Sequence, residues 1–133
     1  MEYHFDHEKL KAHQQSIQFI AWVTPLLDHL DKSLAVRDQL DRASTSVPRN
    51  IAEGNAKFSM KERCSYLDTA YGSALECAAA LDVLLAQKRM LSKDVHDGKL
   101  ILYQVVSLII GLRNDAQSRI NNNSNKYEVV RKE

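Results

Sequence analysis

The sequence predicts an all-α protein, an up-down four-helix bundle with a kinked second helix. Apolar residues recur at helical spacing along most of the chain, and glycine is rare, with 4 residues among 133. The length corresponds to one domain, and an apolar content of 44% is enough to form a buried core. Short polar stretches divide the pattern into four segments, and each segment is long enough to be one helix of the bundle.

The first predicted helix covers residues 6–30 and contains Pro25. A proline inside a helix removes one backbone hydrogen bond, so we expect a bend at this point. The apolar positions of this segment are Leu10, Ile17, Phe19, Ile20, Val23, Leu26, Leu27 and Leu30. Asp31, Lys32 and Ser33 form the turn that follows.

The second predicted helix, residues 34–57, keeps its apolar spacing across Pro48. Its apolar positions are Val36, Leu40, Ala43, Val47, Ile51, Gly54 and Phe58. A chain break at Pro48 would lose this phase, so we expect one kinked helix. The hydroxyls of Ser44, Thr45 and Ser46 are candidates to satisfy the carbonyls that the proline frees. Gly54 has two explanations, the close approach of a neighbouring helix or a helix C-cap.

The third helix is predicted over residues 60–89, after a capping box formed by Ser59 and Glu62. Its predicted heptad positions are Leu67, Tyr71, Ala74, Ala78, Leu81 and Leu85, widened by Ala70, Cys77 and Leu84. The fourth helix is predicted over residues 93–120, capped by Ser92. Because Ile101, Leu108 and Ile110 extend its apolar side around most of the helix, we expect a subunit interface there. Residues 1–120 would form the bundle, and residues 121–133 a polar, disordered tail.

Composition restricts the classes of function. The net charge is +1, from 18 basic and 17 acidic residues, so binding to a nucleic acid would need local clusters of cations. Residues 1–10 are polar and charged and lack the apolar stretch of a signal peptide. The longest apolar run, residues 100–112, is too short to cross a bilayer, so we expect no membrane. Cys64 and Cys77 would lie about 20 Å apart on one helix, beyond disulfide reach, which indicates a reducing, cytoplasmic setting.

Residue patterns that mark common active sites are missing from the sequence. No Glu is followed by a His three residues later, as a di-iron bundle requires, and there is no Gly-x-Ser-x-Gly or Cys-x-x-Cys pattern. His4, Asp6 and His7 are interpreted as solvated residues at the chain end and not as a metal site. We therefore expect no enzymatic activity, no cofactor and no small-molecule substrate.

The outer side of the second predicted helix carries alternating charges, at Asp38, Arg42, Arg49, Glu53 and Lys57. The favoured interpretation is a ladder of ion pairs between residues four apart. The alternative is a basic ridge for phosphates, with Arg37, Arg42, Arg49, Lys57, Lys61 and Arg63 as the contacts. Glu53 and Glu76 are either ordinary surface residues or partners of an Arg or a backbone donor across an interface.

Three short stretches resemble one protein family. Residues 46–54, SVPRNIAEG, resemble the Ser-Ile/Val-Pro-x-Asn-Ile-Ala-Glu-Gly signature of the bacterial four-helix-bundle proteins encoded in intervening sequences of large-subunit ribosomal RNA genes. Residues 70–76, AYGSALE, are similar to the Ala-x-Gly-Ser-x-x-Glu segment of that family, and residues 39–43, QLDRA, to its Gln-Leu-Arg-Arg-Ala. The family also includes accessory proteins of diversity-generating retroelements.

The resemblance implies an up-down bundle that assembles as a ring-shaped homopentamer. It also implies a nucleic-acid-binding role as one option, since the retroelement members are strongly basic and associate with a reverse transcriptase and RNA. Asp41 in place of an arginine, Lys57 where arginine is common, and a net charge near zero weaken that option. The two hypotheses are thus a self-assembling bundle that serves as a nucleic-acid accessory protein and a structural oligomer that binds no nucleic acid. The signature and the segment after it are interpreted as packing residues, which are Pro48, Asn50, Ile51, Glu53, Gly54, Gly72, Ser73 and Glu76.

Overall fold

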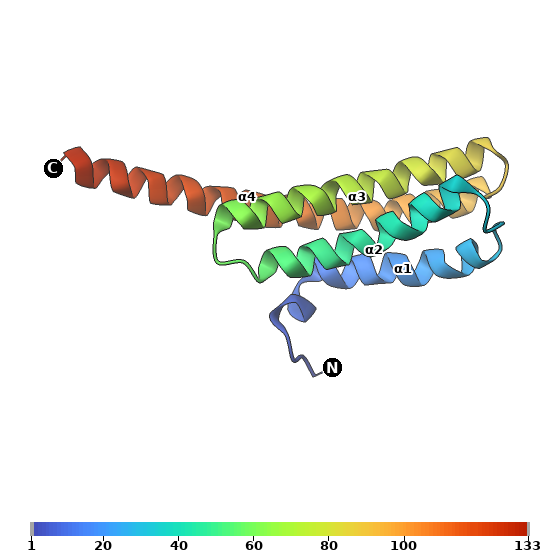
Figure 1. Ribbon diagram of the computed structural model, residues 1–133, viewed down its shortest axis with the longest axis horizontal. Coiled ribbons are helices and arrows are strands. Elements are labelled where there is room, and N and C mark those ends of the chain that lie inside the picture. The colour runs from blue at the N-terminus through green and yellow to red at the C-terminus, as the bar shows by residue number, and fades with distance from the viewer. Residues whose placement is uncertain (1, 133) are drawn as a thin grey trace.

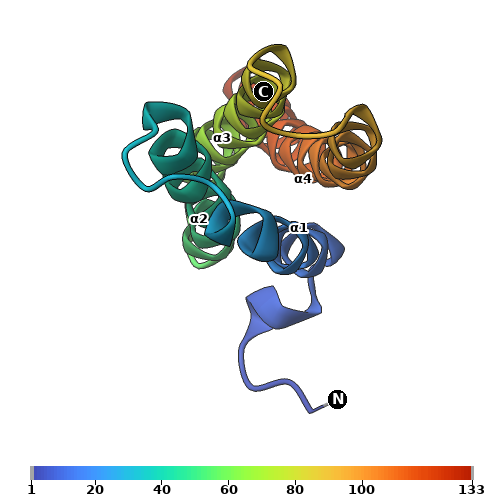
Figure 2. The ribbon, with the colours of Figure 1, turned by 90° about the vertical axis from the view of Figure 1, so that its right-hand side faces the viewer.

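The computed structural model describes the backbone of residues 2–132 and the side chains of residues 2–124. Over that backbone it contains the short 3-10 helix η1 (Asp6–Lys9) and four α-helices without any strand. The helices are α1 (Lys11–Asp28), α2 (Ala35–Asn55), α3 (Met60–Ala86) and α4 (Ser92–Lys132). Figure 1 shows successive helices running in opposite directions. α1 and α3 each pack against both α2 and α4, and Figure 2 shows this cyclic arrangement end-on. The predicted up-down four-helix bundle is confirmed for the single chain.

The start of the predicted first helix is wrong. Residues 6–9 form η1, and Leu10 has extended backbone angles (φ −74°, ψ 125°) before α1 begins at Lys11. The Gln14 side-chain amide donates a hydrogen bond to the Glu8 carbonyl (2.9 Å), and this contact holds the separate turn against α1. α1 then continues through Pro25 to Asp28, so it ends two residues earlier than predicted.

α2 continues through Pro48 as one helix, as predicted, and its ribbon changes direction part-way along in Figure 1. The expected apolar positions from Val36 to Gly54 are all buried. Phe58 is the exception, at 99% exposed, because α2 ends at Asn55 and Phe58 lies in the loop before α3. The hydroxyls of Ser44 and Thr45 donate to the carbonyls of Asp41 and Arg42, one turn earlier, and not to the Ser44 carbonyl that Pro48 leaves without a donor.

Gly54 is buried at a close approach of α2 to α3. A Cβ atom on Gly54 would lie 2.9 Å from the Cβ of Tyr66, a separation that real Cβ atoms essentially never show. The C-cap of α2 is Ala56 and not Gly54. Of the two explanations for this glycine, the close approach of a neighbouring helix is therefore the correct one.

The buried side of α3 agrees with most of the predicted positions. The buried ones are Leu67, Ala74 and Leu81 of the heptad and the widening residues Ala70, Cys77 and Leu84. Tyr71 (37%) and Leu85 (38%) are partly exposed, in contrast to the prediction. The reason is that α3 contacts α2 as well as α4, which turns its buried side toward the centre of the bundle. The Ser59 half of the predicted capping box is present, since the Ser59 hydroxyl accepts a hydrogen bond from the Glu62 N–H (3.3 Å).

Both ends of the α3–α4 connection differ from the prediction. α3 ends at Ala86, where Lys88 adopts a left-handed conformation (φ 60°) and the Arg89 N–H returns to the Leu84 carbonyl (2.9 Å). A lysine at this position gives no sequence signal for such a helix end, which glycine normally provides. α4 begins at Ser92 itself, since the Val95 N–H donates to the Leu91 carbonyl.

α4 continues to Lys132, so the predicted end near Ile120 is wrong. The predicted disordered tail covers residues 121–133, and the side chains from residue 125 onward lie outside the described residues. The division of the chain into bundle and tail therefore stays a prediction. By length and composition alone, the segments Met60–Ala86 and Ser92–Ser124 would each be able to cross a membrane. This is weak evidence, because core helices of a soluble bundle have the same properties.

Replacing Gly54 tests whether the close approach of α2 and α3 limits stability. We predict that Gly54→Ala lowers the free energy of unfolding by about 1–3 kcal/mol, because two Cβ atoms must separate, and that Gly54→Leu disrupts folding or assembly. Denaturant titration at one protein concentration measures both changes.

Gly72→Ala, measured at a protein concentration at which the chain is unassembled, is the matched control, since a Cβ at Gly72 meets no atom of its own chain within 4 Å. The better helix propensity of alanine should raise stability there by about 0.5–1 kcal/mol. Equal effects of the two alanine substitutions would show that Gly54 has no steric role.

Candidate functional site

The two family-like sequence motifs face each other across α2 and α3. Ser46 Oγ lies 2.8 Å from Ser73 Oγ, which joins the first motif to the second. Asn50, which is buried, donates its side-chain amide to the Ser46 carbonyl (2.8 Å) and to Ser46 Oγ (2.9 Å). These three side chains form a polar cluster, termed here the Ser–Asn cluster, whose hydrogen bonds stay within the bundle. Packing and hydrogen bonding between α2 and α3 account for the positions of these residues. Within the cluster neither serine hydroxyl has a basic side chain beside it that would activate it as a nucleophile.

The other motif residues divide between the interior and the surface. Pro48 and Ile51 are buried beside Gly54. Glu53, Gly72 and Glu76 are exposed in the single chain, on the outer sides of α2 and α3. The exposed residues therefore do not stabilise the α2–α3 contact within one copy.

Four of the six candidate cations contact their own chain. Arg37 Nε donates to the Leu27 carbonyl (2.9 Å), and Arg63 Nε donates to the Lys57 carbonyl (2.7 Å). The Lys57 ammonium lies 5.3 Å from the centre of the Tyr66 ring, and Arg42 pairs with Asp38 (3.1 Å). The remaining two, Arg49 and Lys61, are exposed.

The predicted ion-pair ladder on α2 is formed only at its first step. Among the side chains described, Asp38–Arg42 is paired, and neither Arg49–Glu53 nor Glu53–Lys57 comes within ion-pair distance. Lys57 turns toward Tyr66 on α3, which removes it from the ladder. The ladder prediction is therefore wrong beyond its first pair.

The cysteines and histidines show no arrangement typical of catalysis. Cys64 and Cys77 are both free and buried, and burial raises the pKa of the Cys77 thiol to about 12, with a further increase from the charge of Glu76. The His7 ring lies edge-on to His13 (4.7 Å between centroids), and burial lowers the pKa of His13, as does the charge of His7, while Glu8 raises it. In residues 2–124, no three His, Cys, Asp or Glu side chains are placed to hold a metal ion.

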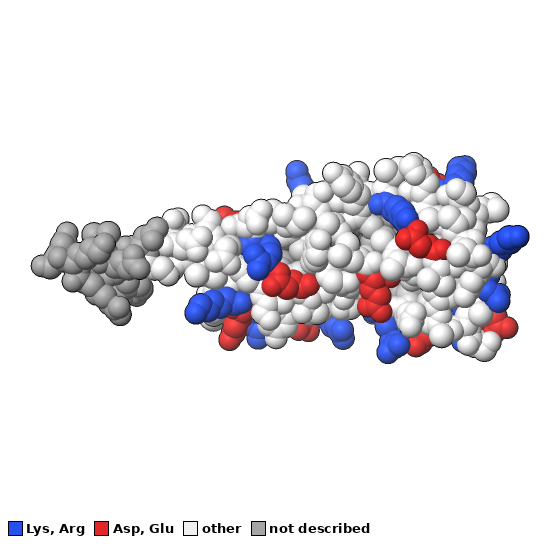
Figure 3. All heavy atoms as spheres, turned by 90° about the horizontal axis from the view of Figure 1, so that it is seen from above, with Lys and Arg blue, Asp and Glu red and all other residues white. Residues whose placement is uncertain are grey.

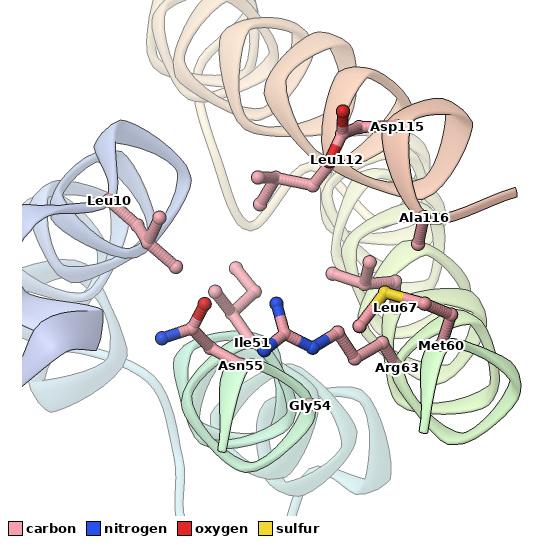
Figure 4. A pocket seen from close by; sticks show the side chains of 10 residues that line it. All are labelled: Leu10, Ile51, Gly54, Asn55, Met60, Arg63, Leu67, Leu112, Asp115 and Ala116. Atoms are coloured by element: carbon pink, nitrogen blue, oxygen red, sulfur yellow. The ribbon is translucent and has the colours of Figure 1, made fainter. Parts of the chain in front are cut away.

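A small cavity lies at the end of the bundle that contains the α2–α3 loop. Its volume is about 40 Å³, enough for only a few water molecules. Figure 4 shows the Arg63 side chain entering this space between Asn55 and Leu67, with Asp115 at the far wall. The size of this cavity suits bound water and not a substrate.

Apolar side chains gather instead on the outside of α3 and α4. We term this surface the α3–α4 outer face, and its members are Tyr71, Leu75 and Val83 of α3 and Leu100, Tyr103 and Ile110 of α4. Leu75 is 46% exposed and Tyr103 is 74% exposed. Two ion pairs, Lys99–Asp82 and Arg113–Asp68, link the helices here. Figure 3, which looks onto this side, shows a largely uncharged surface between two pairs of blue and red side chains.

Sequence reasoning found this face only in part. Of the three residues expected to widen the apolar side of α4, Ile110 is exposed, whereas Ile101 and Leu108 are half-buried. Leu100 and Tyr103 were missed. The spacing of Leu100, Tyr103 and Ile110 by three and seven residues was a usable signal, because residues at this spacing share one side of a helix.

The fold and the two facing motifs define a class of protein, a small four-helix bundle whose signature residues form an internal helix contact. Residues 8–111 match the family of 23S rRNA-intervening sequence proteins, and the chain belongs to this family. A crystal structure of a protein of unknown function from Bacteroides thetaiotaomicron, from the S23 ribosomal protein family, has the same fold, with a TM-score of 0.71 and 19% identity. The likeness covers 77% of this chain and 97% of the other. No curated protein matches the sequence.

Removing the Ser73 hydroxyl tests the Ser–Asn cluster. We predict that Ser73→Ala lowers the free energy of unfolding by about 0.5–1.5 kcal/mol, because Ser46 loses one hydrogen-bond partner across the two helices. Ser65→Ala is the matched control on the exposed side of α3 and should change stability by less than about 0.5 kcal/mol. If both variants unfold at the denaturant concentration of the wild type, the hydrogen bond contributes nothing to stability.

Proposed function

We propose that the protein is a non-enzymatic helical bundle that assembles with copies of itself, and that the α3–α4 outer face is the surface through which copies meet. The observation that carries the proposal is the presence of six large, exposed apolar side chains on the outer sides of α3 and α4. Single exposed apolar residues are normal, whereas an apolar group of this kind is typical of an interface. The two ion pairs on this face give it polar groups as well, as in many interfaces.

The copy number that we propose is five, arranged as a ring in a reducing, cytoplasmic setting. The number five rests on the resemblance to family members alone. Without that resemblance a dimer would be expected, because dimers are the commonest homo-oligomers. The two free and buried thiols support the reducing compartment. Burial raises the pKa of the Cys77 thiol to about 12, so this thiol stays protonated near neutral pH.

A charged residue on the outer face should separate the copies. We predict that the purified protein has the mass of five chains by light scattering, and that Leu75→Glu shifts it to smaller species with unchanged helix content. Leu91→Glu is the matched control, because Leu91 is 72% exposed but lies in the loop between α3 and α4. A wild-type protein that is monomeric at micromolar concentration would refute self-assembly.

A second candidate function is binding of a single-stranded nucleic acid at the loop between α2 and α3. The observation that favours it is the full exposure of Phe58, with the exposed cation Lys61 three residues after it. Exposed aromatic rings can stack on bases, and nearby cations can contact phosphates. Arg49 is a further exposed cation, whereas Arg37, Arg42, Lys57 and Arg63 contact groups of their own chain.

Single-stranded RNA tests this candidate directly. We predict that binding weakens steeply as salt rises and that Phe58→Ala weakens it by about tenfold, the loss expected for one stacked base. Phe5→Ala is the control for an exposed phenylalanine elsewhere. Absence of binding at low salt would leave the assembly as a structural oligomer that binds no nucleic acid.

A further inference from the structure

An open groove lies between α1 and α4, next to the α3–α4 outer face. It consists of two adjoining spaces of about 580 and 280 Å³ that share Lys11, Ser107 and Leu108. Gln14 lines one end, and Gly111 lines the other. Tyr103 belongs both to this groove and to the outer face, so the two surfaces are continuous. The nine residues from Tyr103 to Gly111 extend for about 12 Å along α4, a length that suits about two turns of a docked helix.

The lining of the groove carries a single charge. Of the side chains that form its walls, Lys11 is the charged one, and the others are amide, hydroxyl, aromatic or apolar groups. A surface of this kind favours an occupant that is mostly apolar and carries one negative charge, because an unmatched lysine would lose hydration when it is covered.

The outward side of α3 has these properties. Leu75 and Val83 are exposed there with the small residues Gly72 and Ala79, and Glu76 lies among them with a negative charge. A Cβ at Gly72 would meet nothing within the chain, so this position leaves room for a second helix to come close. Asp68 and Asp82, at the two ends of this stretch, are already paired with cations of α4. Glu76 is therefore the acidic side chain on this side of α3 that has no ion-pair partner within the described residues.

We propose that the groove between α1 and α4 of one copy receives the outward side of α3 from the next copy, with Glu76 paired to Lys11 across the interface. This inference rests on the proposed self-assembly and specifies its geometry. The two surfaces differ, so the contact is head-to-tail, and each copy uses each surface once. A two-fold contact through one of these surfaces alone would bring Glu76 toward Glu76 or Lys11 toward Lys11, which like-charge repulsion disfavours. The proposed ring of five requires a head-to-tail contact. Head-to-tail contacts close into a ring when the rotation between copies completes a circle, and they form open filaments otherwise.

Reversing the two charges separately and together tests the proposal. We expect Lys11→Glu and Glu76→Lys each to weaken assembly by about tenfold or more in sedimentation and light scattering, because like charges then meet at every interface. The double variant should recover assembly, because opposite charges then meet at every interface. An equimolar mixture of the two single variants should recover assembly in part, because a ring of five cannot alternate the two variants at every contact. Lys32→Glu and Asp41→Lys are the controls, since both residues are exposed and lie outside the two surfaces. Circular dichroism of each variant checks that the helices are intact.

The outcomes separate this inference from the proposal on which it rests. A wild-type protein that is monomeric would overturn both. A wild-type assembly that tolerates both single reversals, or a double variant that stays dissociated, would overturn the Lys11–Glu76 contact and leave self-assembly in place. Recovery in the double variant and partial recovery in the mixture would support the contact, since no pairing within one copy explains a gain of assembly on mixing.

Discussion

The contact between α2 and α3 at Gly54 and Tyr66 is the constraint on which the rest of the bundle depends. There the two helices come so close that a Cβ atom on Gly54 would lie 2.9 Å from the Cβ of Tyr66. Further along the same pair of helices, Ser46 and Ser73 meet at 2.8 Å. A steric contact at one level and a hydrogen bond at another fix both the separation of the helices and their relative position along the axis. Ile51, at 0% exposed, lies between these two levels.

The α2–α3 contact also determines which residues of α3 stay exposed on the surface of the bundle. With one side of α3 committed to α2 and the centre of the bundle, Leu75, Glu76 and Val83 are left exposed on the opposite side. α4 likewise presents Leu100, Tyr103 and Ile110 to the outside. The residues that make the family recognisable therefore build the scaffold, and surfaces beyond them offer contacts to other molecules. In this chain the interior polar groups are satisfied locally, and among the side chains described no buried polar atom lacks a hydrogen-bond partner.

Much of the fold followed from the sequence, because periodicity reports directly on burial. The continuous α2 was predictable, since its apolar spacing crosses Pro48 without losing phase. The end of α3 was not, because it depends on Lys88 in a left-handed conformation that a lysine does not signal. Phe58 was placed in the apolar pattern by spacing alone, which cannot show that the helix has already ended. The roles of the candidate cations depended on tertiary partners such as the Leu27 carbonyl and the Tyr66 ring, which lie on other elements of the fold.

A double-mutant cycle between Gly54→Ala and Tyr66→Gly tests the central contact most directly. Glycine at position 66 is required, because the atom approached is the Cβ of Tyr66, which alanine would retain. If the steric contact is as short as it is in the structure, removing one Cβ relieves the strain of adding the other. The double variant should then be less destabilised than the sum of the single variants by more than about 0.5 kcal/mol in unfolding free energy. Additive effects of the two substitutions would contradict the account.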